Sequence, residues 1–119
     1  MSPTLPWTLF ALGICHVVYG SIKFKAPLRD AITSGFVGKF SVPEARRSAF
    51  WFMMFGPLLM LAGQVTIHAV VINDAYLVRL VGFYLFAVSA VGVVALPKSP
   101  FLAGLVISLL LLGVGYGFL

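Results

Sequence analysis

Hydrophobic residues in this chain fall into four long runs, and most polar residues gather between them. The runs cover about residues 6–22, 48–72, 75–96 and 101–119. A run of about 20 apolar residues forms an α-helix that crosses the ~30 Å hydrocarbon core of a bilayer. The pattern therefore predicts an all-α fold, an integral membrane four-helix bundle that forms a single domain over residues 1–119. Because the connections are short, sequential helices are expected to be antiparallel.

The segment between the first two runs carries a weaker helical pattern. From Pro27 to about Phe40, apolar residues recur at helical spacing among polar ones. Such an amphipathic stretch is expected to form a short helix in the headgroup plane of the membrane. Gly35 and Gly38 are typical of the end of a helix, so they are expected to stop it.

The start of the second membrane helix has a sequence signature of its own. In Ser41-Val42-Pro43-Glu44, Ser41 is placed to cap the helix and Glu44 falls at the third helical position. This is the pattern of a capping box, which predicts that the helix begins just after Ser41. Pro57 lies inside the run and predicts a kink.

Composition and charge place the chain in a membrane and orient it there. Hydrophobic residues make up 61% and charged residues 9%, with a mean hydropathy of +1.10, whereas soluble domains carry about 25% charged residues. Most of the basic residues fall between the first two runs: Lys23, Lys25, Arg29, Lys39, Arg46 and Arg47. By the positive-inside rule, loop 23–47 is cytoplasmic and both termini lie outside. We expect a multi-pass protein of a bacterial inner membrane, in preference to a eukaryotic internal membrane, and no nucleic-acid partner.

Small and polar residues mark the face of each helix that is expected to turn inward. Helices in lipid pack closely through small residues, and polar side chains avoid acyl chains. The faces are Gly13, His16 and Gly20 in the first run; Gln64 and His68, with Gly56 and Gly63 on an adjoining face, in the second; Arg79, Gly82, Phe86 and Ser89 in the third; and Gly104, Ser108, Leu111 and Gly115 in the fourth.

The depths of these residues predict two candidate clusters. At 1.5 Å per residue, His16 lies about 9 Å from the cytoplasmic surface, near the levels of Phe55, Ser89 and Ser108. The inner cluster provides His16, Tyr19 and Glu44 as candidate catalytic residues, and it provides Arg46, Arg47, Trp51, Ser89 and Ser108 as candidate ligand-binding residues. The second candidate cluster, in the outer half, is Gln64, His68 and Arg79.

Each polar residue also has a structural interpretation. His16 fits a hydrogen-bonded bridge between two helices, a proton-transfer group or a metal ligand. Arg79 fits a side chain that reaches the outer surface or pairs with Asp74. Neither histidine belongs to a metal-binding pattern, so no metal and no cofactor is predicted.

Three functional hypotheses follow from these residues. The first is an inner-leaflet pocket that holds a lipophilic small molecule or a lipid headgroup, with membrane lipids as partners and a homo-oligomer as its assembly. The second is a membrane-embedded isomerase or cyclase with His16 as base and Glu44 or Tyr19 as acid. The third is an accessory subunit of a larger membrane complex. Whether the protein is an enzyme stays open at this point.

Three segments carry a family resemblance over nearly the whole chain. They are Arg46-Arg47-Ser48-Ala49-Phe50-Trp51-Phe52-Met53-Met54-Phe55-Gly56, the Gly13-x-x-His16 spacing, and Val91-Gly92-Val93-Val94-Ala95-Leu96-Pro97. With these, the chain resembles a family of small uncharacterised four-span integral membrane proteins, a domain of unknown function found mainly in bacteria. The resemblance implies the four-span topology and no activity.

Overall fold

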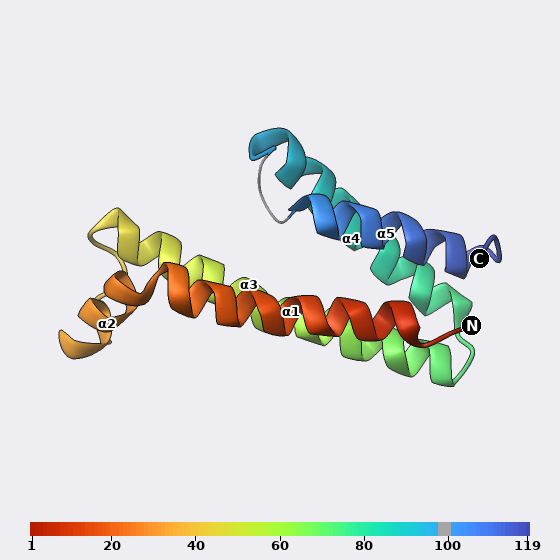
Figure 1. The fold of residues 1–119 in the computed structure, drawn as a ribbon, viewed down its shortest axis with the longest axis horizontal. Coiled ribbons are helices and arrows are strands. Elements are labelled where there is room, and N and C mark those ends of the chain that lie inside the picture. The colour runs from red at the N-terminus through yellow and green to blue at the C-terminus, as the bar shows by residue number, and fades with distance from the viewer. Residues whose placement is uncertain (98–100) are drawn as a thin grey trace. The chain divides into compact units, whose positions relative to one another are not determined.

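The computed structural model describes residues 1–97 and 101–119, and these residues form five helices and no strands. The helices are α1 (Thr4–Lys23), α2 (Lys25–Thr33), α3 (Glu44–Val71), α4 (Ala75–Ala95) and α5 (Phe101–Gly115), shown in Figure 1. Three of them, α1, α3 and α4, are long and apolar enough to cross a membrane. The predicted all-α fold is confirmed, and the expected short helix between the first two runs is α2.

Residues 10–61 form one compact unit, in which α1 lies beside the first part of α3 (Figure 1). Glycines bring the two backbones close together. A Cβ atom on Gly13 would lie 2.7 Å from the backbone nitrogen of Met60, and one on Gly56 would collide with the side chain of Val17. Gly13 and Gly20 are both buried, as the expected inward face of the first run requires.

Residues 1–9 and 62–119 form the other unit, in which α4 and α5 pack along each other (Figure 1). The buried residues of the pair are Val78, Gly82, Leu85, Ser89 and Gly92 on α4, and Gly104, Ile107, Ser108, Leu111 and Gly115 on α5. The expected inward faces are therefore confirmed except for Phe86, which is 37% exposed, and Arg79, which is only half-buried. The buried residues of α4 follow one another at alternating intervals of four and three residues, so they lie along one face of the helix. Leu85 belongs to this series and Phe86 does not.

The structure corrects the expected inward face of α3. Gln64 and His68 are exposed, whereas Gly56 and Gly63 on the adjoining face are buried. Glycines let two helix backbones approach closely, so the glycine face gains more packing than the polar face would.

Helices α2, α3 and α5 all end in the same motif, in which a residue with positive φ follows the helix. After α2, Gly35 has φ +114°, and the N–H groups of Phe36 and Gly35 donate to the carbonyls of Ala31 and Ile32. This pair of hydrogen bonds is a Schellman motif, which satisfies carbonyls at the end of a helix. The prediction that Gly35 stops this helix is confirmed, and α2 ends at Thr33, although the helical pattern of apolar residues continues to about Phe40.

The same motif shortens the last helix. Gly117 has φ +83°, and the N–H groups of Phe118 and Gly117 donate to the carbonyls of Gly113 and Val114. Helix α5 thus has 15 residues and ends at Gly115, whereas the sequence predicted a span to residue 119. The connection predicted around Lys98 falls on residues 98–100, which lie outside the described ranges.

The two-residue connection between α3 and α4 closes one helix and starts the next. Asn73 has φ +60° and donates its N–H to the carbonyl of Val70, and Asp74 donates its N–H to the carbonyl of Ala69. The Asp74 side chain also accepts a hydrogen bond of 3.1 Å from the N–H of Leu77 and so caps α4. The tight connection predicted at Asn73-Asp74 is confirmed.

Candidate functional site

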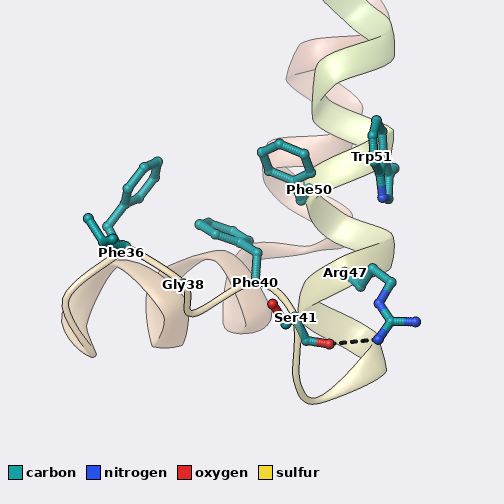
Figure 2. Close-up of a pocket in the computed structure, with 8 residues that line it drawn as sticks. Phe36, Gly38, Phe40, Ser41, Arg47, Phe50 and Trp51 are labelled. Carbon is teal, nitrogen blue, oxygen red and sulfur yellow. Dashed lines mark hydrogen bonds between the residues drawn. The ribbon is translucent and has the colours of Figure 1, made fainter.

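Four aromatic rings form a continuous chain from the loop before α3 into α3 itself. Phe36 contacts Phe40 with ring centroids 5.2 Å apart, Phe40 contacts Phe50 at 5.4 Å, and Phe50 contacts Trp51 at 5.3 Å. These rings line an open pocket of about 560 Å³, drawn in Figure 2, whose remaining lining residues are Val37, Gly38, Ser41 and Arg47. We call this site the aromatic pocket.

Backbone geometry in the loop brings these rings to α3. Phe36 and Gly38 both have positive φ, of +67° and +69°, and the N–H of Lys39 donates to the Phe36 carbonyl. These two residues with positive φ turn the loop back toward α3. Few residues other than glycine adopt this conformation, so Phe36 is held there at a cost of about 1–3 kcal/mol.

Two arginines at the start of α3 hold the loop by its carbonyl groups. Arg47 Nη2 donates to the Ser41 carbonyl at 2.9 Å, the bond drawn in Figure 2, and Arg46 Nη1 donates to the Lys39 carbonyl at 3.4 Å. Helix α3 begins at Glu44, two residues after the start that the capping box predicted. Ser41, which precedes this start, is held to α3 by the hydrogen bond from Arg47 to its backbone carbonyl.

The aromatic pocket combines an apolar wall with one cation. A guanidinium group has five N–H donors in a planar fork that matches carboxylate and phosphate groups. Arg47 is exposed and uses one of these donors on Ser41. The pocket thus has the chemistry to hold an apolar body against its rings and an anionic group at Arg47.

His16 links α1 to α3 in the unit of residues 10–61. Its Nε2 lies 2.8 Å from the carbonyl oxygen of Phe52, and its ring stacks on the Phe52 ring at 3.9 Å and meets the Phe55 ring edge-on at 5.5 Å. A carbonyl only accepts hydrogen bonds, so Nε2 carries the proton. The bridging interpretation of His16 is confirmed, as is its expected level near Phe55.

The other inner-cluster residues lie in different surroundings. The Tyr19 ring is tilted against Phe52 at 6.0 Å, with the Lys23 amine 5.7 Å from its centre, and Glu44 is exposed at the start of α3. None of the hydrogen bonds or ring contacts within residues 1–97 joins His16 to Tyr19 or Glu44. Of the predicted ligand-binding residues, Arg47 and Trp51 line the aromatic pocket.

Ser89 and Ser108 are buried in the packing of α4 against α5. The Ser108 hydroxyl donates to the Leu105 carbonyl at 2.6 Å, and a Cβ on Gly104 would lie 2.6 Å from the Ser89 hydroxyl oxygen. Neither serine lines the aromatic pocket.

Arg79, from the outer cluster, holds the end of α5. Its Nη1 donates to the Gly115 carbonyl at 3.0 Å, and its guanidinium lies 5.1 Å from the centre of the Tyr116 ring. A cation is favourable at the C-terminus of a helix, where the carbonyl groups point outward. Arg79 does not pair with Asp74, the alternative that the sequence offered; its guanidinium binds the Gly115 carbonyl, and the Asp74 side chain caps α4.

Comparison with protein families decides the family of this chain. Residues 1–114 match a family of unknown function, DUF6463. The chain belongs to this family. Neither the curated proteins nor the solved structures contain a match to it. The DUF6463 assignment agrees with the resemblance to a domain of unknown function, and it assigns no activity.

Sequence reasoning missed three rings of the aromatic pocket in this DUF6463 member, namely Phe36, Phe40 and Phe50. A signal for them was present, because aromatic residues flank the two glycines of a basic loop. What the sequence did not give was the backbone path after Gly35, where the positive φ angles of Phe36 and Gly38 turn the loop so that Phe40 meets Phe50.

Proposed function

We propose that this protein is a multi-pass integral membrane protein whose aromatic pocket binds an anionic amphiphile at the cytoplasmic surface of the membrane. The ligand would place its apolar part against the rings of Phe36, Phe40, Phe50 and Trp51. Its anionic group would accept hydrogen bonds from Arg47. A phospholipid with a net negative headgroup has this chemistry.

Membrane insertion is supported by how little of the apolar surface is covered. In the most apolar window of α1, α3 and α4, 22%, 33% and 28% of the residues are buried. Large side chains such as Tyr84, Val91 and Val94 on α4 are 70% or more exposed. Apolar faces of this extent are stable in lipid and costly in water.

The orientation of the proposed protein follows from its charges. The basic segment 23–47, which holds α2 and the aromatic pocket, would face the cytoplasm of a bacterium, and the Asn73-Asp74 connection would face outward. Helix α5 is about 22 Å long at 1.5 Å per residue, shorter than the ~30 Å core, so a fourth crossing would need locally thinner lipid.

The observation that carries the binding proposal is the continuous chain of four rings with Arg47 in the same pocket. Aromatic side chains favour the level of the lipid headgroups, where one end meets apolar chains and the other meets water. A volume of about 560 Å³ lies in the range of small-molecule sites.

The same structure favours binding over acid–base catalysis at His16. The proton on Nε2 is already shared with the Phe52 carbonyl, and the ring is stacked on Phe52. Nδ1 is then the nitrogen that could act as a base, but within residues 1–97 neither proposed acid, Glu44 or Tyr19, is hydrogen-bonded to His16. The four rings and Arg47, by contrast, line one site.

Fluorescence of Trp51 offers a direct test. The chain has two tryptophans, Trp7 and Trp51, so a Trp7→Phe variant reports on the pocket alone. We expect phosphatidylglycerol with brominated acyl chains, in bilayer nanodiscs, to quench Trp51 more strongly than brominated phosphatidylcholine does. The preference arises because Arg47 pairs with a net anionic headgroup.

The neighbouring arginine provides a matched control. Arg47→Gln and Arg46→Gln each remove one positive charge next to the membrane, but only Arg47 lines the pocket. We expect Arg47→Gln to abolish the lipid preference and Arg46→Gln to keep most of it. Equal quenching by the two lipids, or equal loss in both variants, would contradict a specific site and leave only general attraction to an anionic surface.

A further inference from the structure

Two polar side chains on α3 lack a partner among the residues that the structure describes. Gln64 and His68 are one helical turn apart, both are exposed, and neither side chain makes a hydrogen bond to a described residue. Gln64 precedes the last residue of α3, Val71, by about two turns, or roughly 10 Å. In the membrane orientation proposed above, its amide therefore lies within the hydrocarbon.

An amide group at this depth in the hydrocarbon is destabilising unless it makes a hydrogen bond. A polar group that leaves water without a hydrogen bond costs about 2–7 kcal/mol. The glutamine side chain is too short to reach the headgroups from roughly 10 Å, whereas His68 lies only one turn from the end of α3. The amide of Gln64 thus needs a hydrogen-bond partner that the described residues do not provide.

We propose that α3 pairs with α3 of a second copy of this chain, with Gln64 facing Gln64 across a two-fold axis normal to the membrane. This inference rests on the membrane insertion proposed above. Val71, which is 74% exposed, lies two turns after Gln64 on the same face and would meet its counterpart at the outer end of the contact.

The depth of Gln64 and the chemistry of its side chain both favour a second copy of this chain as the partner, over a different protein. Two copies inserted in the same orientation place Gln64 at the same level in both, so a two-fold axis brings like against like. A carboxamide has both a donor N–H and an acceptor oxygen, so two of them form reciprocal hydrogen bonds. Glutamine is among the residues that join helices in this way inside membranes.

Cysteine cross-linking in native membranes tests the pairing. The only native cysteine is Cys15, so a Cys15→Ser background removes other thiols. In that background we expect Val71→Cys to form a disulfide-linked dimer on oxidation with copper phenanthroline. Tyr76→Cys is the matched control, because Tyr76 is 66% exposed at the start of α4, near the same end of the helices; it is expected to stay monomeric.

The contribution of Gln64 is measured with one further pair of variants. Gln64→Leu in the Val71→Cys background should lower the yield of cross-linked dimer. We expect the dimer association constant to fall about 5- to 30-fold, the equivalent of about 1–2 kcal/mol. Gln64→Asn keeps an amide and should retain most of the association. No Val71→Cys cross-link, or a cross-link that Gln64→Leu leaves unchanged, would overturn the proposed pairing.

Extraction with alkaline carbonate separates this failure from failure of the membrane proposal. Protein that stays in the membrane pellet but does not cross-link would overturn only the pairing. Protein that carbonate releases would overturn membrane insertion, and the pairing would fall with it.

Discussion

Replacing Gly13 with alanine should separate α1 from α3. An added Cβ would lie 2.7 Å from the backbone nitrogen of Met60 and 3.0 Å from the carbonyl oxygen of Gly56. Backbone atoms inside a helix cannot swing aside as a side chain can, so α1 must move away by several tenths of an ångström. The hydrogen bond from His16 to the Phe52 carbonyl, now 2.8 Å and one turn along α1, would lengthen with it.

The size of the effect follows from three contributions. Overpacking costs about 1–3 kcal/mol, and weakening an interhelical hydrogen bond in a membrane costs about 0.6 kcal/mol. The higher helix propensity of alanine returns up to about 1 kcal/mol. We therefore expect Gly13→Ala to lower the free energy of unfolding by about 1–3 kcal/mol.

Titration with sodium dodecyl sulfate, followed by circular dichroism, measures this change. Ala11→Val is the control, because Ala11 is exposed on the same helix and adds volume without meeting a neighbour. A Gly13→Ala protein that is as stable as the parent, or more stable, would show that helix propensity outweighs the close contact and that the contact is looser than the structure indicates.

Three further substitutions test the helix ends. Asp74→Ala should cost about 1 kcal/mol in the same titration because it removes the cap of α4, while Asp74→Asn should cost little. Arg79→Met removes a charged hydrogen bond to the Gly115 carbonyl and should cost about 1–2 kcal/mol, with faster amide hydrogen exchange after Gly115. Gly35→Ala forces a Cβ onto a residue with φ +114° and should cost about 1–2 kcal/mol, with a shifted emission of Trp51. An unchanged midpoint in any of the three would contradict the role given to that residue.

The helices were predictable because their signals are local. A hydrophobic run defines a membrane-length helix without reference to the rest of the chain, and Asn73-Asp74 marks a break by its own turn chemistry. Small residues also identified the packing faces of α1, α4 and α5, since glycine is favoured wherever two backbones meet. The length of α5 was overestimated because the run continues past Gly117, where the backbone turns.

Two features could not be predicted from the residue pattern within a single helix. Gln64 and His68 were expected to face inward on the argument that polar groups avoid lipid, but that argument does not say whether the protecting surface belongs to the same chain. The aromatic pocket depends on where Gly35 stops α2. A difference of a few residues in that position decides whether Phe40 lies on a helix or against Phe50.

The position of His16 separates the pocket seen in the structure from the one that the sequence predicted. The predicted inner cluster included His16, whereas the lining of the aromatic pocket comes entirely from residues 36–51. His16→Ala removes a hydrogen bond and a ring stack, so it should lower the free energy of unfolding by about 1–3 kcal/mol. It should nevertheless leave the phosphatidylglycerol preference of Trp51 intact, measured with the Trp7→Phe protein in nanodiscs at a temperature at which both forms are folded. If His16→Ala lost the phosphatidylglycerol preference while its free energy of unfolding stayed unchanged, His16 would belong to the binding site. That result would favour the predicted inner cluster over the aromatic pocket.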